Sequence, residues 1–73
     1  MTGEQLAAIR LKLGERTQEQ MAKLLGVSLV GLKRFETDKR PIPAYIAVSV
    51  RAIELCHKQG LLPLLEKLLK KRL

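Results

Sequence analysis

The chain has 73 residues and a formal net charge of +7, from 14 Lys and Arg residues against 7 Asp and Glu residues. This length excludes more than one domain, and so small a domain buries little surface, so we expect a partner subunit to stabilise it. The positive charge favours a polyanionic partner, nucleic acid before an acidic membrane surface, although a small basic domain can also use such charge simply for solubility.

The residue types favour helices and argue against catalysis. The chain holds one Tyr, one Phe and no Trp, and it is rich in helix-forming Leu, Ala, Lys and Glu, so we expect an all-α fold. It has a single His, no paired carboxylates, no phosphate-binding glycine loop and no metal-ligand spacing, so neither an enzyme nor a metal or other cofactor is expected. No apolar run approaches the roughly 20 residues that a membrane-spanning helix needs. The single cysteine, Cys56, excludes an internal disulfide and, with the lack of a signal peptide, fits a reducing cytoplasm.

The first predicted helix covers residues 2–13. Thr2 and Gln5 have the spacing of a capping box, in which each side chain accepts a hydrogen bond from the other residue's backbone amide. Gly14 follows as a helix stop, because glycine adopts the left-handed backbone of a C-terminal cap. Apolar residues recur at helical spacing on the inward face: Leu6, Ile9 and Leu13.

The second predicted helix begins after Thr17, which has capping-box spacing with Gln20. Gly26 ends this helix, again as a left-handed cap, and Val27 is expected to fill the following corner with an apolar side chain. The inward residues recur at helical spacing: Met21, Leu24 and Leu25.

Ser28 is a suitable N-cap for a third predicted helix, which runs to Glu36. Its inward face would be Leu32 and Phe35. A loop at residues 37–44 follows, in which Asp38 is expected to tolerate a left-handed backbone.

Residues 44–59 predict a fourth helix that is apolar on most sides, more than one small domain can cover. Its main stripe is Ile46, Val50 and Ile53, widened by Val48, Ala52, Leu55 and Cys56. Adjacent helical positions point about 100° apart, so Cys56 and His57 are not expected to bind a metal together. We therefore place Cys56 in the core or an interface, and His57 on the surface.

Gly60 ends the fourth helix, and residues 61–73 predict a fifth, with Pro63 tolerated in its first turn. Its apolar face would be Leu61, Leu62, Leu65, Leu68 and Leu69. Cations gather at its C-terminal end, where they suit the helix dipole: Lys67, Lys70, Lys71 and Arg72.

The spacing within residues 18–35 is more specific than any single helix. Counted from Gln18, Ala22 stands at the fifth position and Gly26 at the ninth, and the residue at the fifth must be small where two helices cross closely. Apolar residues stand at further fixed positions: Met21, Leu25, Val27, Leu32 and Phe35. With Gln18 at the helix start and the FETDKRPIP run after the third helix, this pattern resembles the phage-repressor and Cro-type, or XRE-like, family of helix-turn-helix domains, over roughly residues 4–53.

The resemblance implies a five-helix, lambda-repressor-like fold whose third helix enters the major groove of double-stranded DNA. It also implies an ion pair between Arg10 and Glu36, with a solvated Arg10 as the alternative. At the start of the second helix, where Thr17 caps, the resemblance implies that the Gln18 side chain contacts the DNA backbone. The alternative for Gln18 is a plain first-turn helix residue.

The outward residues of the third helix match the reading positions of that family: Ser28, Leu29, Val30, Lys33 and Arg34. Arg34 could donate two hydrogen bonds to guanine, and Lys33 could contact guanine or a phosphate. Leu29 and Val30 depart from the polar residues often found there and could pack only on thymine methyl groups. Their alternative is a protein interface on a motif that no longer binds DNA.

The loop after the third helix adds two predicted phosphate contacts, Lys39 and Arg40, which would position the protein without reading sequence. The alternative for both is a solvated loop charge. Gln18, Lys39 and Arg40 would then hold the duplex backbone on either side of the third helix.

We therefore divide the chain into a helix-turn-helix DNA-binding domain, residues 1–60, and a C-terminal amphipathic helix, residues 61–73. The latter is expected to form a homodimer together with the fourth helix; the alternatives are a cap on the monomer core and, least favoured, a segment lying on a membrane. The expected function is a cytoplasmic, prokaryotic or phage-encoded transcriptional regulator. As a repressor it would occlude a promoter at a near-palindromic operator whose half-sites lie about 34 Å apart. The alternative is a protein-interaction module, such as an antitoxin that neutralises its partner through the C-terminal helix.

Overall fold

The computed structural model describes residues 1–71, with side chains through residue 70. Its helices are α1 (Gly3–Lys12), α2 (Gln18–Leu25), α3 (Leu29–Glu36), α4 (Ala44–Lys58) and α5 (Leu62–Lys71). No strand occurs among these residues, so the predicted all-α class with five helices is confirmed. The predicted helices included cap residues, Thr2, Leu13 and Gln59, that lie just outside the observed ones. The predicted helical residues Arg72 and Leu73 lie outside the described range.

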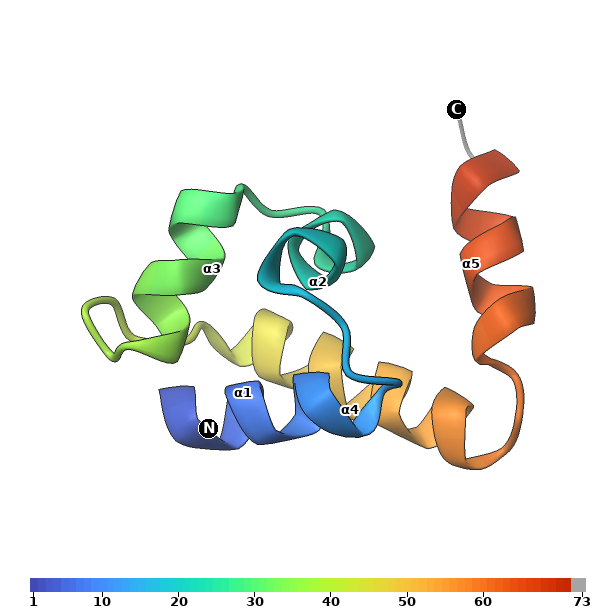
Figure 1. The fold of residues 1–73 in the computed structure, drawn as a ribbon, viewed down its shortest axis with the longest axis horizontal. Helices are drawn as coiled ribbons and strands as arrows, with labels where there is room; N and C mark the ends of the chain where they lie inside the picture. Colours follow the sequence, from blue (N-terminus) through green and yellow to red (C-terminus); the bar gives the residue numbers. More distant parts are fainter. Residues whose placement is uncertain (72–73) are drawn as a thin grey trace.

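The helices form two layers and one projecting arm (Figure 1). Helices α1 and α4 lie side by side, and α2 and α3 pack across them. Helix α5 stands at the end of the molecule away from α3 and is joined to the rest mainly through α4.

One apolar core receives side chains from every helix. Its buried members are Leu6, Ile9, Leu13, Met21, Ala22, Leu32, Phe35, Ile46, Val50, Ile53 and Leu62. These include the inward residues predicted for α1 and α3 and the main stripe of α4, and Val27 packs against the same cluster from the corner between α2 and α3. Because Ala22 is buried in this core, a larger side chain there would have to displace its neighbours.

The helix starts follow the expected capping chemistry. The Thr17 hydroxyl accepts from the Gln20 amide at 3.1 Å, and the Thr17 amide donates to the Gln20 side chain at 2.9 Å. The same reciprocal pair forms between Thr2 and Gln5. At the end of α2, Gly26 has φ of +74°, the left-handed backbone that favours glycine.

Helix α4 buries one face and leaves the opposite face open. Val48 is 68% exposed and Leu55 58% exposed, and Tyr45 also projects into solvent. His57 is exposed, as predicted. Cys56 is half-buried and does not belong to the core, and its place in an interface stays a prediction. One chain therefore covers only part of the apolar surface of α4.

Helix α5 divides its leucines between two faces. Leu62 is buried and Leu65 packs against the core, whereas Leu61, Leu64 and Leu68 are each about half exposed. The predicted single apolar face had grouped Leu61 and Leu68 with Leu62 and Leu65 and had omitted Leu64. None of the helices described is long and apolar enough to cross a membrane.

Candidate nucleic-acid interface

Helix α3 presents a mixed basic and apolar face to solvent. Lys33 and Arg34 are exposed and Val30 is 57% exposed, while Leu29 is half-buried. These residues are neighbours because positions four apart share a helix face. The buried Leu32 and Phe35 hold the opposite face against the core. Rotation of α3 about its axis would expose Leu32 and Phe35, so burial of these two residues fixes which face of α3 points to solvent.

The start of α3 is fixed by Ser28. Its hydroxyl accepts from the Gly31 amide at 3.0 Å, which confirms the predicted N-cap. Helix α3 spans eight residues, or about 12 Å along its axis at the usual rise. The diameter of an α-helix with its side chains, about 10–12 Å, is the dimension that matches the width of a B-DNA major groove.

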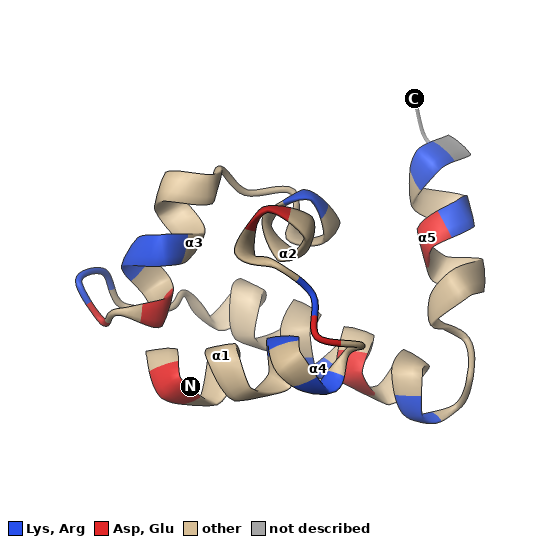
Figure 2. Cartoon of the chain, in the orientation of Figure 1, with Lys and Arg blue, Asp and Glu red and all other residues tan. Residues whose placement is uncertain are grey.

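The basic loop after α3 is folded back onto the helix end. The Lys39 and Arg40 amides both donate to the Arg34 carbonyl, at 2.9 and 3.3 Å. Asp38 has φ of +58°, the left-handed backbone expected for it, and this conformation turns the chain. Lys39 and Arg40 are exposed, and Figure 2 shows their charge at the same end of the molecule as that of α3.

Asp38 also ties this loop to α1. Its Oδ1 accepts from the Gly3 amide at 2.9 Å, satisfying an amide that the helix start leaves free. A Cβ at Gly3 would lie 2.3 Å from the Glu36 carbonyl oxygen, so only glycine lets α1 come this close to the end of α3. Asp38 was predicted only to tolerate the left-handed backbone, and its contact with Gly3 was missed because it joins residues distant in sequence.

Arg10 and Glu36 form the predicted ion pair, with 2.8 Å between Nε and Oε2. The two side chains are only 15% and 6% exposed, so the alternative of a solvated Arg10 is wrong. Arg10 also donates from Nη1 to the Arg16 carbonyl at 2.7 Å. The guanidinium therefore joins α1, the turn before α2 and the end of α3.

Gln18 is part of the same network. Its Nε2 donates to Glu36 Oε1 at 3.0 Å, which brings the start of α2 against the end of α3. The amide nitrogen is thus already bonded, a contact that the sequence did not indicate. Contact between Gln18 and a phosphate stays a prediction, as does the part of the exposed Thr17 in DNA binding.

The candidate residues converge on α3. Gln18 reaches its C-terminal end from α2, the loop with Lys39 and Arg40 bonds to that end, and Lys33 and Arg34 project from the helix itself. Two carboxylates lie near these residues. Glu36 is paired with Arg10, whereas Asp38 is exposed. The arrangement is a hydrogen-bonded surface with excess positive charge. No group of side chains that could hold a metal ion occurs in the part of the chain described.

Comparison of the chain with protein-family models, curated proteins and solved structures found no significant match. Membership of the helix-turn-helix family expected from the spacing therefore stays a prediction.

Proposed function

We propose that the protein binds double-stranded DNA with sequence preference, by placing α3 in the major groove as a helix-turn-helix domain does. The observation that carries this proposal is the exposed face of Val30, Lys33 and Arg34 on a helix whose other face is locked into the core. A groove-reading helix needs side chains that reach base edges from a rigid support, and phosphate contacts on its flanks.

The flanking contacts come from Lys39 and Arg40 on one side and the start of α2 on the other. Backbone amides at a helix start attract phosphate oxygens, and the α2 start lies against the end of α3 through the Gln18–Glu36 hydrogen bond. Arg34 and Lys33 are the proposed hydrogen-bonding base contacts, and Leu29 and Val30 would lie against thymine methyl groups.

The protein would act as a homodimer, because the open apolar faces of α4 and α5 need a cover. At least about half of each of these apolar side chains is exposed: Val48 and Leu55 on α4, Leu61 just before α5, and Leu64 and Leu68 on α5. A second copy would bury them and place two α3 helices on successive major grooves of a near-palindromic site. Repression by occluding a promoter is the simplest use of such a dimer, because a bound dimer covers the duplex that it occupies.

The experiment is selection of bound duplexes from a random pool with the full chain. Recovered sequences that share a two-fold-related word would support dimeric, sequence-selective binding. Recovery of sequences with no common word would refute sequence preference.

A second candidate is a protein-interaction module, such as an antitoxin, favoured by the exposed Leu64 and Leu68 of α5 and by Leu61 just before it. Deleting the segment from Leu61 onward would also remove Leu62 from the core, so exposed positions give a cleaner test. A gel shift with the double variant Leu64→Gln and Leu68→Gln distinguishes the two candidates. Loss of both the dimer and selective DNA binding would support the dimeric repressor. Unchanged DNA binding would mean that DNA binding does not need this face, and would favour its use in binding another protein.

A further inference from the structure

A groove with a volume of about 420 Å³ lies between α2 and α5, apart from the face of α3. Leu24 of α2 and Leu69 of α5 provide its apolar walls, and both are only half-buried by the rest of the chain. Its polar lining consists of Arg16, Gln20, Lys23, Glu66 and Lys70. The groove exists because α5 is seated by Leu62 and Leu65 in its first turns, while its later turns stand away from α2 (Figure 1).

The charges around this groove are unbalanced. Arg16, Lys23 and Lys70 face a single lining carboxylate, Glu66, which is already paired with Arg16. Lys23 has Glu19 as an outside neighbour at 3.7 Å, but both side chains are largely exposed, so water screens that pair. An entering anion would therefore meet uncompensated positive charge beside an apolar wall.

The size and lining together select a class of ligand. Pockets of a few hundred Å³ with apolar walls and a few polar groups are typical of small-molecule sites. A neutral apolar molecule would gain no electrostatic attraction from Lys23 and Lys70, and these two lysines would repel a cation. A small molecule with one carboxylate and an apolar body satisfies both parts of the lining.

We infer that the α2–α5 groove binds small amphipathic carboxylates, with the apolar body against Leu24 and Leu69 and the carboxylate between Lys23 and Lys70. Arg16 lies at the same site and neutralises Glu66, so that Glu66 does not repel the bound carboxylate. The site does not depend on the proposed DNA binding, because it uses no residue of the α3 face.

The test uses the full chain and three probes of equal chain length: octanoate, octan-1-ol and octylamine, each below the concentration at which it forms micelles or separates from water. Backbone amide NMR signals are followed during titration. Octanoate should produce saturable shifts at Gln20, Lys23, Leu24 and Leu69, and the alcohol and the amine should produce weaker shifts or none there. No DNA is present, so the result is separate from that of the duplex selection.

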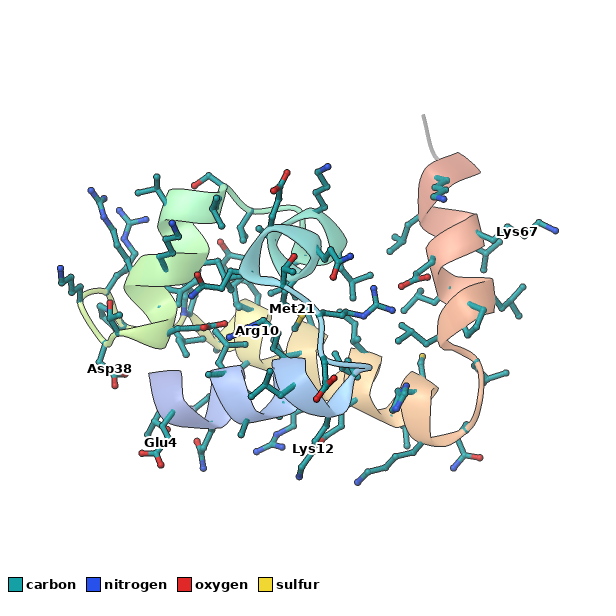
Figure 3. All side chains as sticks on the ribbon, in the orientation of Figure 1. Glu4, Arg10, Lys12, Met21, Asp38 and Lys67 are labelled. Atoms are coloured by element: carbon teal, nitrogen blue, oxygen red, sulfur yellow. The ribbon has the colours of Figure 1, made fainter. Side chains whose placement is uncertain are left out.

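Lys70→Glu should weaken octanoate binding about fivefold or more, since reversing one nearby charge changes an exposed interaction by about 1 kcal/mol. Lys67→Glu is the matched control, because Lys67 lies on the same helix but points away from the body of the protein (Figure 3). Equal loss in both variants, equal shifts with octylamine, or no shifts at the groove residues would overturn the inference. So would a change in sedimentation of Lys70→Glu with unchanged octanoate affinity, since the groove would then belong to a contact between copies.

Discussion

Arg10 and Glu36 join α1 to the end of α3 through two hydrogen bonds, Nε to Oε2 at 2.8 Å and Nη2 to Oε1 at 3.2 Å. Such a two-point contact fixes orientation as well as distance, because the planar guanidinium matches the carboxylate edge. A third donor of Arg10, on Nη1, bonds the Arg16 carbonyl, and the Arg16 side chain pairs with Glu66 on α5. A continuous series of polar contacts therefore runs from α3 through α1 and the loop between α1 and α2 to α5.

Glu36→Gln should destabilise the fold by about 2–4 kcal/mol, because it leaves the Arg10 charge half-buried without its counter-ion. Urea unfolding measures this loss. Glu54→Gln is the control: its partner Arg51 is 56% exposed, so we expect a change of about 0.5 kcal/mol or less. Equal effects of the two substitutions would mean that the Arg10–Glu36 pair adds no stability of its own.

Gly3→Ala should destabilise by about 1–3 kcal/mol, because the added methyl would overlap the Glu36 carbonyl and force α1 away from α3. The same shift would lengthen the bond from the Gly3 amide to Asp38 and loosen the basic loop. Thermal unfolding checks the prediction, with Glu4→Ala as the control because Glu4 is exposed on the outer side of α1 (Figure 3). A Gly3→Ala variant as stable as the parent would contradict this account of the contact.

Arg34→Ala should cost about 1–3 kcal/mol of affinity for the preferred duplex and relax selectivity at one base position. The physical reason is loss of a paired hydrogen bond to a guanine edge, which no smaller side chain replaces. Repeating the duplex selection with the variant measures both effects. A uniform loss on all sequences would instead assign Arg34 to a phosphate.

Lys39→Ala should weaken binding to every duplex alike and reduce the slope of log affinity against log salt by about one unit. One phosphate contact fewer releases about one counter-ion fewer. Lys12→Ala provides the control, since Lys12 is exposed on α1 and points away from α3 (Figure 3). If the Lys39→Ala slope equals that of the parent, Lys39 does not touch the duplex backbone.

The double substitution Leu64→Gln and Leu68→Gln should convert a dimer to a monomer, because both side chains lie on the open face of α5 and contribute little to the monomer core. Analytical ultracentrifugation gives the mass, and circular dichroism should show an unchanged helical signal. Lys67→Gln, also on α5, should leave the dimer intact. A parent chain that sediments as a monomer at all concentrations would exclude the proposed homodimer.

Several elements could be predicted from short-range patterns alone. The two capping boxes, the Ser28 cap and the left-handed Gly26 each depend on residues within one turn, so local spacing was sufficient. The inward faces of α1 and α3 and the main stripe of α4 followed from helical periodicity, because one side of each helix has to be buried. The Arg10–Glu36 pair, which crosses the fold, was expected only through resemblance to a known family.

The contacts that the sequence did not predict join segments distant along the chain. Nothing in the local pattern indicates that Gln18 bonds Glu36, that Asp38 accepts from Gly3, or that Arg16 meets Glu66. The face of α5 was also only partly predicted, because which leucines point inward depends on the angle at which α5 leaves α4.

Short-range patterns in the sequence set which segments become helices and, to within a residue or two, where the helices begin and end, since caps and periodicity act over a few residues. How the helix ends are joined depends on the fold, since a hydrogen bond between distant side chains forms only after the core has set the helices in place. In this protein, such hydrogen bonds connect the end of α3 to the basic loop and to the start of α2.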